Sequence, residues 1–146
     1  MRIVIQRVQN AEVIINNKLH SSIDYGLLCL VGFCDTDNVV DLEWALKKIT
    51  TLKLFNNQLS LDDVEGELLI VSQFTLFASV KKGTKPSWYK AAKPDHAKEI
   101  YNSFVSICRD KLFERVKTGF FGADMKIKST NDGPVTIIID TKNKDY

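Results

Sequence analysis

The sequence has few of the residues on which most catalytic and metal sites depend. Its 146 residues include two histidines, His20 and His96, and three cysteines. The cysteine count is odd and no pair has the C-x-x-C spacing, which argues against a disulfide framework and a structural zinc site. A Ser-His-Asp or Cys-His pairing would need one of the histidines, and both lie in polar segments typical of solvated surface. We therefore expect no metal and no cofactor.

Long apolar runs and glycine-rich phosphate loops are also missing. The longest apolar run, Tyr25–Phe33, contains two glycines and is much shorter than the roughly 20 residues that cross a bilayer. The N-terminal segment has no apolar stretch of signal-peptide length. Neither the G-x-G-x-x-G pattern nor the P-loop pattern occurs. These absences predict a cytoplasmic protein without the usual nucleotide-binding loops.

What is present is the composition of an ordinary globular domain. Hydrophobic residues make up 45% and charged residues 26% of the chain, and this length suits one domain, residues 1–146, with a full core. The net charge is only +2, but its distribution is uneven. Segment 81–93 holds five lysines, with Trp88 and Tyr89 among them and no acid. This asymmetry predicts a basic face.

Apolar periodicity predicts an α+β fold, with a curved, mixed and mostly antiparallel β-sheet and two main helices. Helices are expected over residues 35–52 and 93–113, where apolar residues recur with the helical period. In the second helix the predicted buried stripe is Ala97, Ile100, Tyr101, Phe104, Val105, Cys108 and Leu112. Strands are expected over residues 2–8, 11–16, 25–33, 52–55, 67–78, 124–129 and 135–140. The tail, 141–146, is expected to fray.

Polar residues follow directly after an apolar run at "SQFTL", Ser72–Leu76. In a regular strand Ser72 and Phe74 would face one side, and Gln73 and Thr75 the other. The pattern alone favours a strand that runs to an exposed edge, where polar side chains meet water. A functional site at this point is the alternative.

The run "NDGPVT", Asn131–Thr136, places a glycine-proline pair before the most strand-like stretch of the chain. Proline cannot donate to a sheet ladder, so Pro134 belongs at a strand start or an edge. Gly133 relieves the crowding that proline imposes on the residue before it. One interpretation is a tight turn that opens the last strand. The other is that the rigid pair itself has a function.

Six motifs in this order indicate a family. They are "QRV" (Gln6–Val8), "GLLCLVG" (Gly26–Gly32), "VSQFTL" (Val71–Leu76), "KKGTKPSW" (Lys81–Trp88), "FGADM" (Phe121–Met125) and "NDGPVT" (Asn131–Thr136). In these motifs and their spacing the chain resembles, almost from end to end, the D-aminoacyl-tRNA deacylase family. The resemblance implies a homodimeric enzyme that hydrolyses the ester between a D-amino acid and its tRNA.

The resemblance also implies roles for residues. Ser72, Gln73, Phe74 and Thr75 would line the reaction centre of one subunit. Gly133 and Pro134, joined by a cis peptide, would enter that centre from the partner subunit and screen chirality, steadied by Arg7. Lys81, Lys82, Lys85 and Lys90 would contact tRNA. The family usually has Arg where this chain has Lys85, and the turn near Asn56–Gln58 is shorter than usual. Lys cannot form the bidentate fork of Arg, so this change bears on tRNA binding.

An aminoacyl ester is labile, so modest help suffices to cleave it. We expect backbone N–H groups near Phe74 and Thr75 to stabilise the oxyanion, while the 2′-hydroxyl of the terminal ribose orients or activates water. A wall at Gly133-Pro134 would clash with an L side chain but cannot exclude glycine, so glycine mischarged on tRNA for alanine is a further expected substrate. The alternative is a non-catalytic nucleic-acid-binding homodimer that uses the Lys81–Lys93 loop, with Trp88 and Tyr89 stacking on bases.

Overall fold

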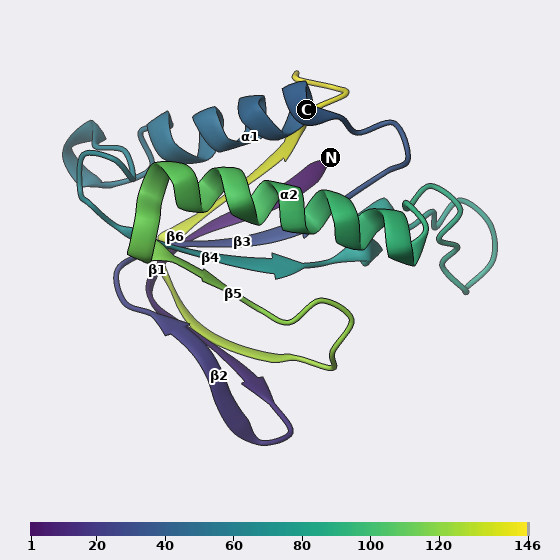
Figure 1. Ribbon diagram of the computed structural model, residues 1–146, viewed down its shortest axis with the longest axis horizontal. Coiled ribbons are helices and arrows are strands. Elements are labelled where there is room, and N and C mark those ends of the chain that lie inside the picture. Colours follow the sequence, from purple (N-terminus) through teal and green to yellow (C-terminus); the bar gives the residue numbers. More distant parts are fainter. Residues whose placement is uncertain (146) are drawn as a thin grey trace.

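The computed structural model describes residues 1–145, in which two helices cover one face of a mixed sheet (Figure 1). The strands are β1 (Arg2–Ile15), β2 (Lys18–Ile23), β3 (Gly26–Gly32), β4 (Glu67–Ser72), β5 (Val116–Thr118) and β6 (Lys126–Asp140). The α-helices are α1 (Val39–Thr51) and α2 (Pro94–Leu112), and the 3-10 helices are η1 (Asn56–Gln58), η2 (Phe74–Phe77) and η3 (Phe113–Arg115). Within this described range, no helix is long and apolar enough to cross a membrane.

The sheet is organised around β1. Strands β2, β3 and β6 pair with β1 in antiparallel fashion, whereas the β3–β4 and β4–β5 pairs are parallel. The first half of β1 lies between β3 and β6, and its second half lies between β2 and β6. Strand β1 thereby connects the helix-covered layer to an arm of β1, β2 and β6 that curves away from it (Figure 1). The predicted α+β fold, with a mostly antiparallel mixed sheet and two main helices, is confirmed.

The main core lies between the two helices and the sheet. Helix α2 buries the seven residues of the predicted stripe, Ala97, Ile100, Tyr101, Phe104, Val105, Cys108 and Leu112. Burying an aliphatic or aromatic side chain of this size contributes about 1.5–3 kcal/mol, so this stripe fixes α2 on the sheet. A smaller cluster of buried side chains joins the arm to β3 and β4: Val8, Ala11, Val13, Ile23, Leu28, Leu69 and Val71.

Helix α1 begins four residues later than predicted. A capping box marks its start: the Asn38 side chain accepts a hydrogen bond from the Val40 N–H (2.9 Å), and Asp41 Oδ2 accepts one from the Asn38 N–H (2.9 Å). The residues before it form a turn in which the Asp37 N–H donates to the Cys34 carbonyl (3.1 Å). Polar residues suited to capping precede the helix over several positions, so the sequence did not single out the true cap.

The predicted break in the first strand is wrong. Strands were expected over 2–8 and 11–16, but β1 runs from Arg2 to Ile15 without interruption. The exposed residues Gln9 and Asn10 break the apolar pattern, yet the backbone there stays extended, with register shifts against β6. The hairpin partner of β1 is β2, a strand too polar to be recognised. The two-residue turn that joins them, Asn16-Asn17, has the positive φ angles of a type I′ hairpin turn.

Two further strand predictions are corrected. The strand expected over 67–78 ends at Ser72, and the chain turns into the 3-10 helix η2. The strand expected over 52–55 is reduced to an isolated bridge between Phe55 and Leu59. Strand β5, three residues long, was not predicted, because its apolar pattern is too short to register.

The last strand differs from the interpretation of the glycine-proline pair as a tight turn that opens a strand. Separate strands over 124–129 and 135–140 were expected with a turn between them, but β6 is one strand that pairs with β1 along its length. Thr136 lies opposite Gln6 and Asn131 lies opposite Val8. Four residues of β6, 132–135, therefore stand opposite one residue of β1, so this segment forms a bulge. We call it the β6 bulge.

The C-terminal tail is held more firmly than predicted. Thr141 is 5% exposed, its N–H donates to the Met1 carbonyl (2.9 Å), and its hydroxyl accepts a hydrogen bond from the Met1 ammonium (2.8 Å). Lys142 Nζ binds Asp41 Oδ2 (2.6 Å) and the Thr36 carbonyl (2.8 Å). Fraying of residues 141–142 is thus excluded, while the end of the predicted segment, Tyr146, lies outside the described residues.

Candidate active site

An apolar pocket of about 700 Å³ lies where β3 and β4 end. The two strands are parallel, so their carboxyl ends reach the same edge of the sheet. The start of α2 and the connection between β5 and β6 close the other sides. The lining side chains are mostly apolar and include Phe33, Phe74, Trp88, Ala92, Ala97, Phe121 and Met125. A pocket of this size and character is suited to a small organic group.

The predicted stretch Ser72–Thr75 lies at the floor of this pocket. Ser72, Gln73 and Phe74 line it, while Thr75 is the next residue and lies just outside the lining. The Gln73 N–H donates to the Val31 carbonyl (2.6 Å), which extends the β3–β4 pairing by one step. This close approach needs Gly32, since a Cβ atom there would be 2.8 Å from the Gln73 carbonyl oxygen.

Two backbone N–H groups at this point have no acceptor. The first N–H groups of a 3-10 helix lack partners within the helix. Within residues 1–145, the N–H groups of Phe74 and Thr75, which begin η2, have no other backbone or side-chain acceptor. The Gln73 side-chain amide donates to the Thr75 hydroxyl oxygen and so ties the turn together. The site thus offers hydrogen-bond donors at the edge of an apolar pocket.

Aromatic side chains form one rim of the pocket. The Phe74 and Trp88 rings contact each other edge to face, with centroids 5.3 Å apart. Phe74 is nevertheless 56% exposed. This exposure leaves a flat apolar surface at the pocket mouth, on which a ring could stack.

Strongly reactive side chains are missing from the pocket. Its lining has no histidine and no cysteine, and its single carboxylate belongs to Asp124. Both histidines are exposed, as predicted. Burial raises the pKa of Cys108 to about 12. The pKa of Cys29 is also raised, mainly by burial and to a lesser extent by the nearby Cys108. Both therefore remain protonated thiols at neutral pH. No group of three His, Cys, Asp or Glu suited to a metal ion occurs in the described part of the chain.

Gly133 and Pro134 lie at the exposed tip of the β6 bulge, joined by a cis peptide. The Asn131 amide donates to the Thr136 hydroxyl (3.1 Å) across the base of the bulge. Gly133 has φ +116°, which only glycine adopts without strain. Neither tip residue lines the pocket of its own chain. Within one chain, the structure therefore does not bring the two predicted motifs together.

Arg7 supports the bulge from β1. It is 8% exposed, and its Nε lies 3.0 Å from Asp132 Oδ2, an ion pair without a directed hydrogen bond. Its Nη1 donates to the Leu54 carbonyl (2.7 Å) just before η1. A Cβ on Gly133 would lie 2.8 Å from Arg7 Nη2. Arg7 thus fills the space directly behind Gly133.

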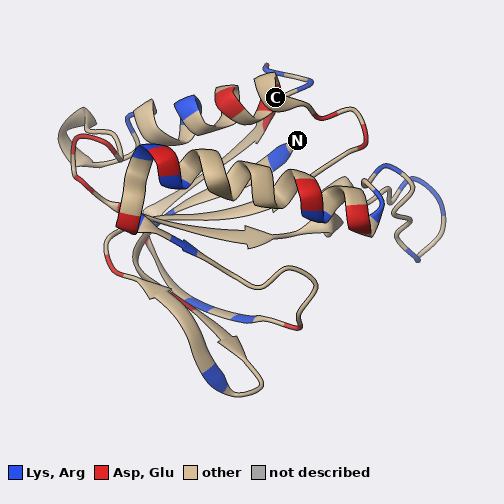
Figure 2. Cartoon of the chain, viewed as in Figure 1, with Lys and Arg blue, Asp and Glu red and all other residues tan. Residues whose placement is uncertain are grey.

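The predicted lysine loop projects from the body of the protein. Lys81, Lys82, Lys85 and Lys90 are all exposed, and Figure 2 shows the loop as a basic protrusion beside the start of α2. Paired hydrogen bonds between the backbones of Ser79 and Ser87 close its base (2.8 and 3.0 Å). Because Trp88 at its end packs on Phe74, the loop is joined directly to the pocket.

Sequence reasoning missed a large part of the pocket wall. Phe121–Met125 belonged to one of the matching motifs, but no role was assigned to it. The segment connects β5 to β6 and contributes all five of its residues to the lining. A glycine-containing segment between a predicted helix and a predicted strand gives no indication of which other elements it will contact.

Comparisons with known proteins agree with this architecture. The family model described as D-Tyr-tRNA(Tyr) deacylase matches residues 4–140. The chain belongs to this deacylase family. Proteins named D-aminoacyl-tRNA deacylase from Cytophaga hutchinsonii and Flavobacterium psychrophilum are each 51% identical to it, over 97% and 99% of this chain and 97% and 100% of their own.

Two solved structures have a similar fold. A structure named c-Myc DNA Unwinding Element Binding Protein superposes with a TM-score of 0.91 at 37% identity, covering 96% of this chain and 98% of its own. A structure titled as a probable eukaryotic D-amino acid tRNA deacylase superposes with a TM-score of 0.84 at 19% identity, over 94% of this chain and 97% of its own. The second likeness shows the shared fold alone.

Proposed function

We propose that this protein hydrolyses the ester bond of D-aminoacyl-tRNA and releases the tRNA and the D-amino acid. The family membership supports this activity, as do the names of relatives at 51% identity. The observation that carries it is the pocket at Ser72–Thr75, which offers free N–H donors and no nucleophile paired with a base. Such a site suits a labile ester better than a stable amide. We also propose that residues 1–146 form one such domain, acting in the cytoplasm, where tRNA is charged.

In the proposed mechanism the apolar pocket holds the terminal adenosine and its ester. The N–H groups of Phe74 and Thr75 donate to the carbonyl oxygen as negative charge develops on it, and one such donor is worth about 3 kcal/mol. Water attacks the carbonyl carbon, assisted by the neighbouring 2′-hydroxyl of the substrate. The bond from the carbonyl carbon to the ester oxygen breaks; one proton of the water goes to that ribose oxygen, which becomes a hydroxyl, and the other passes to solvent as the amino acid leaves as a carboxylate. No metal or cofactor takes part in this proposal.

We further propose that the working unit is a homodimer. Gly133 and Pro134 are exposed and do not line the pocket of their own chain. In the proposed dimer, they enter the pocket of the partner subunit beside the substrate Cα. Their backbone carbonyls would bind the substrate ammonium, and the rigid wall would clash with an L side chain. Arg7, held by Asp132 and the Leu54 carbonyl, would keep this wall in place.

Substrate range and tRNA binding are part of the same proposal. Glycine has no side chain to clash with the wall, so glycine mischarged on tRNA for alanine should also be hydrolysed. Lys81, Lys82, Lys85 and Lys90 would contact phosphates. The second candidate function is non-catalytic nucleic-acid binding, which the exposed lysine loop and the name of one structural relative favour.

Deacylation assays on D-Tyr-, L-Tyr- and Gly-charged tRNA with the purified protein test the proposal. We expect rapid hydrolysis of the D-Tyr and Gly esters, while the L-Tyr ester is spared. Equal hydrolysis of both tyrosyl esters would contradict the chirality wall. No hydrolysis of any ester, with tRNA binding retained, would favour the non-catalytic alternative.

A further inference from the structure

A groove continues from the active-site pocket along α2. Phe121 lines both the pocket and a second hollow of about 550 Å³ between α2 and the connection from β5 to β6. Arg109 and Thr118 in turn line both this hollow and a third one of about 600 Å³ at the C-terminal end of α2. The second and third hollows form what we call the α2 groove, which opens into the pocket at Phe121.

One wall of the α2 groove is a polar stripe on the helix. Lys98, Asn102, Ser106 and Arg109 follow one another at spacings of four, four and three residues, so they lie on one helical face. All four are exposed. None of these four side chains makes a hydrogen bond or ion pair within residues 1–145. The stripe therefore presents free donors and two positive charges to the groove.

The opposite wall carries an exposed aromatic ring. Phe120 is 61% exposed and lines the second hollow, and its ring contacts His20 edge to face, with centroids 6.2 Å apart. A second exposed ring, Phe113 (72% exposed), caps the C-terminal end of α2 and lines the third hollow. Exposed rings near cationic side chains are the arrangement by which proteins bind single-stranded nucleic acid, because bases stack on the rings and phosphates meet the cations.

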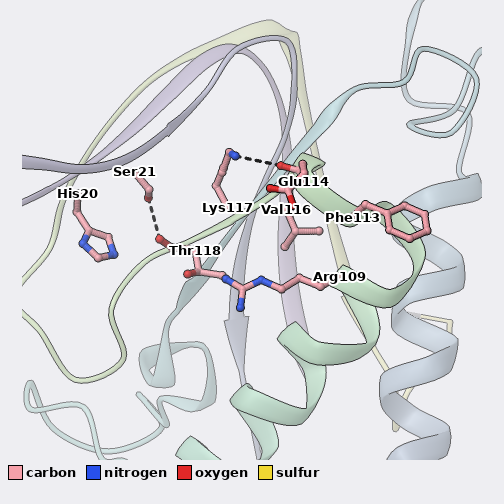
Figure 3. Close-up of a pocket in the computed structure, with 8 residues that line it drawn as sticks. All are labelled: His20, Ser21, Arg109, Phe113, Glu114, Val116, Lys117 and Thr118. Carbon is pink, nitrogen blue, oxygen red and sulfur yellow. Dashed lines mark hydrogen bonds between the residues drawn. The ribbon is translucent and has the colours of Figure 1, made fainter.

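The third hollow places Arg109 between several polar groups. Figure 3 shows the Arg109 side chain extending toward Thr118, with His20 on the facing side. The Ser21 hydroxyl holds the end of β5 by donating to the Thr118 carbonyl (2.7 Å). Lys117 Nζ donates to the Glu114 carbonyl (3.0 Å). The carboxylates of Asp110 and Glu114 also line the groove. The net charge is therefore only slightly positive, and stacking must contribute much of the binding.

We propose that the α2 groove binds the single-stranded nucleotides that precede the terminal adenosine of the substrate RNA. This inference rests on the proposed function, which places that adenosine in the pocket. The eleven residue steps from Lys98 to Arg109 span about 16 Å of helix, long enough for a few unpaired nucleotides. The groove would be a contact surface separate from the lysine loop, and it would explain why unpaired polar side chains and exposed rings line the hollows beside α2.

A binding experiment tests the groove without relying on catalysis. The probe is a fluorescent single-stranded RNA ending in CCA, titrated at several salt concentrations. For the double variant Lys98→Gln/Arg109→Gln we expect about tenfold weaker binding, with a salt slope reduced by about 1.4, since each phosphate contact on a single strand adds about 0.7. Phe120→Ala should weaken binding with little change in slope. Lys47→Gln, which removes one positive charge from the exposed face of α1, should match the wild type.

A kinetic experiment separates the groove from the pocket. With D-Tyr-tRNA, the double variant should show a KM about tenfold higher and an unchanged kcat. With the D-tyrosyl ester of adenosine alone, which has no preceding nucleotides, it should equal the wild type. Unchanged RNA affinity and KM would overturn the inference, as would an equal loss on both substrates or a changed oligomeric mass. A wild type that binds RNA through these residues but cleaves neither ester would instead overturn the proposed function alone.

Discussion

Among single residues, Thr75 carries the hydroxyl most easily mistaken for a nucleophile. Its oxygen accepts a hydrogen bond from the Gln73 amide, and no histidine lines the adjacent pocket to remove its proton. A hydroxyl without a base is a weak nucleophile. We therefore expect Thr75→Ala to keep kcat for D-Tyr-tRNA within about tenfold of the wild type, whereas a substrate ending in 2′-deoxyadenosine should react poorly. A trapped ester on Thr75, seen by mass spectrometry, would contradict this.

Gly133 permits a second residue-scale prediction. An alanine there would take a φ of +116° and place its Cβ 2.8 Å from Arg7 Nη2 and 3.0 Å from Val135 Cγ2. Strain of this kind costs about 1–3 kcal/mol, and Arg7 must also shift. We expect Gly133→Ala to lower kcat/KM for D-Tyr-tRNA more than about tenfold while the protein still folds.

Gly83, which lies outside the pocket lining, provides the matched control for this variant. It also has a positive φ, +66°, but a Cβ there would meet nothing within 4 Å. Gly83→Ala should therefore cause backbone strain without displacing Arg7. Equal kcat/KM losses in the two variants, measured alongside melting curves, would show that strain and not the position of Arg7 is responsible.

At the scale of elements, the start of α1 and the C-terminal tail are joined by one carboxylate. Burial raises the pKa of Asp41, but hydrogen bonds from Lys142 and from the Asn38 backbone outweigh it, so the net shift is downward. The charged form therefore stabilises the fold above the unfolded pKa, near 3.9, and this stabilisation is lost as pH falls through the lower folded value.

The corresponding variant is Asp41→Asn. We expect it to lower the melting temperature by a few degrees at pH 5–8, since loss of a capping interaction costs about 1 kcal/mol. The difference from the wild type should begin to shrink below about pH 4, where the unfolded chain takes up a proton at Asp41, and should vanish only below the lower folded pKa. Glu43→Gln, on the exposed face of the same helix, should show no such difference. A constant difference down to pH 2 would contradict the electrostatic explanation.

The lysine loop is the second element with a measurable consequence. If Lys81, Lys82, Lys85 and Lys90 contact phosphates, the affinity for tRNA should fall log-linearly with salt, each contact adding about 0.7 to 0.9 to the slope. Replacing all four by glutamine should raise KM for charged tRNA and flatten the slope by about 3. An unchanged slope would mean that the loop only adds surface charge.

The sequence predicted the elements that have strong apolar periodicity, but it did not predict those that form only through pairing with other segments. Helix α2 was predicted with its complete buried stripe, because the apolar residues that give the periodic pattern are the residues that pack on the sheet. Strand β2 was missed because its residues are polar and only its pairing with β1 makes it a strand. The pocket was found only at Ser72–Phe74, since the contribution of Trp88 and Phe121–Met125 depends on how distant segments meet.

For the whole molecule, the separation of bulge and pocket predicts that two defective proteins can repair each other. We expect a mass in solution twice that of the 16.6 kDa chain. A pocket variant, Phe74→Asp, and a bulge variant, Gly133→Ala, should each be nearly inactive alone. When they are refolded together, each mixed dimer has one intact site. Activity should then return to about a quarter of the wild-type value for random pairing in a two-fold dimer.

The control for this mixing experiment is a pair of variants in the same site. Phe74→Asp refolded with a second pocket variant, Gln73→Ala, should recover no activity beyond the sum of the two proteins alone. Activity that stays at the sum of the parts in the bulge and pocket mixture as well would contradict a shared site. A monomeric mass for the wild type would do the same.

The β6 bulge has a practical consequence for protein engineering. Its base is closed by the hydrogen bond from Asn131 to Thr136, and the ladder with β1 resumes on both sides. Pro134 at the tip is exposed, so its side chain can be exchanged while Gly133 and the frame of the bulge are kept. A library of residues at position 134, sorted by hydrolysis of esters of either hand, would yield variants with altered stereochemical preference on an unchanged scaffold.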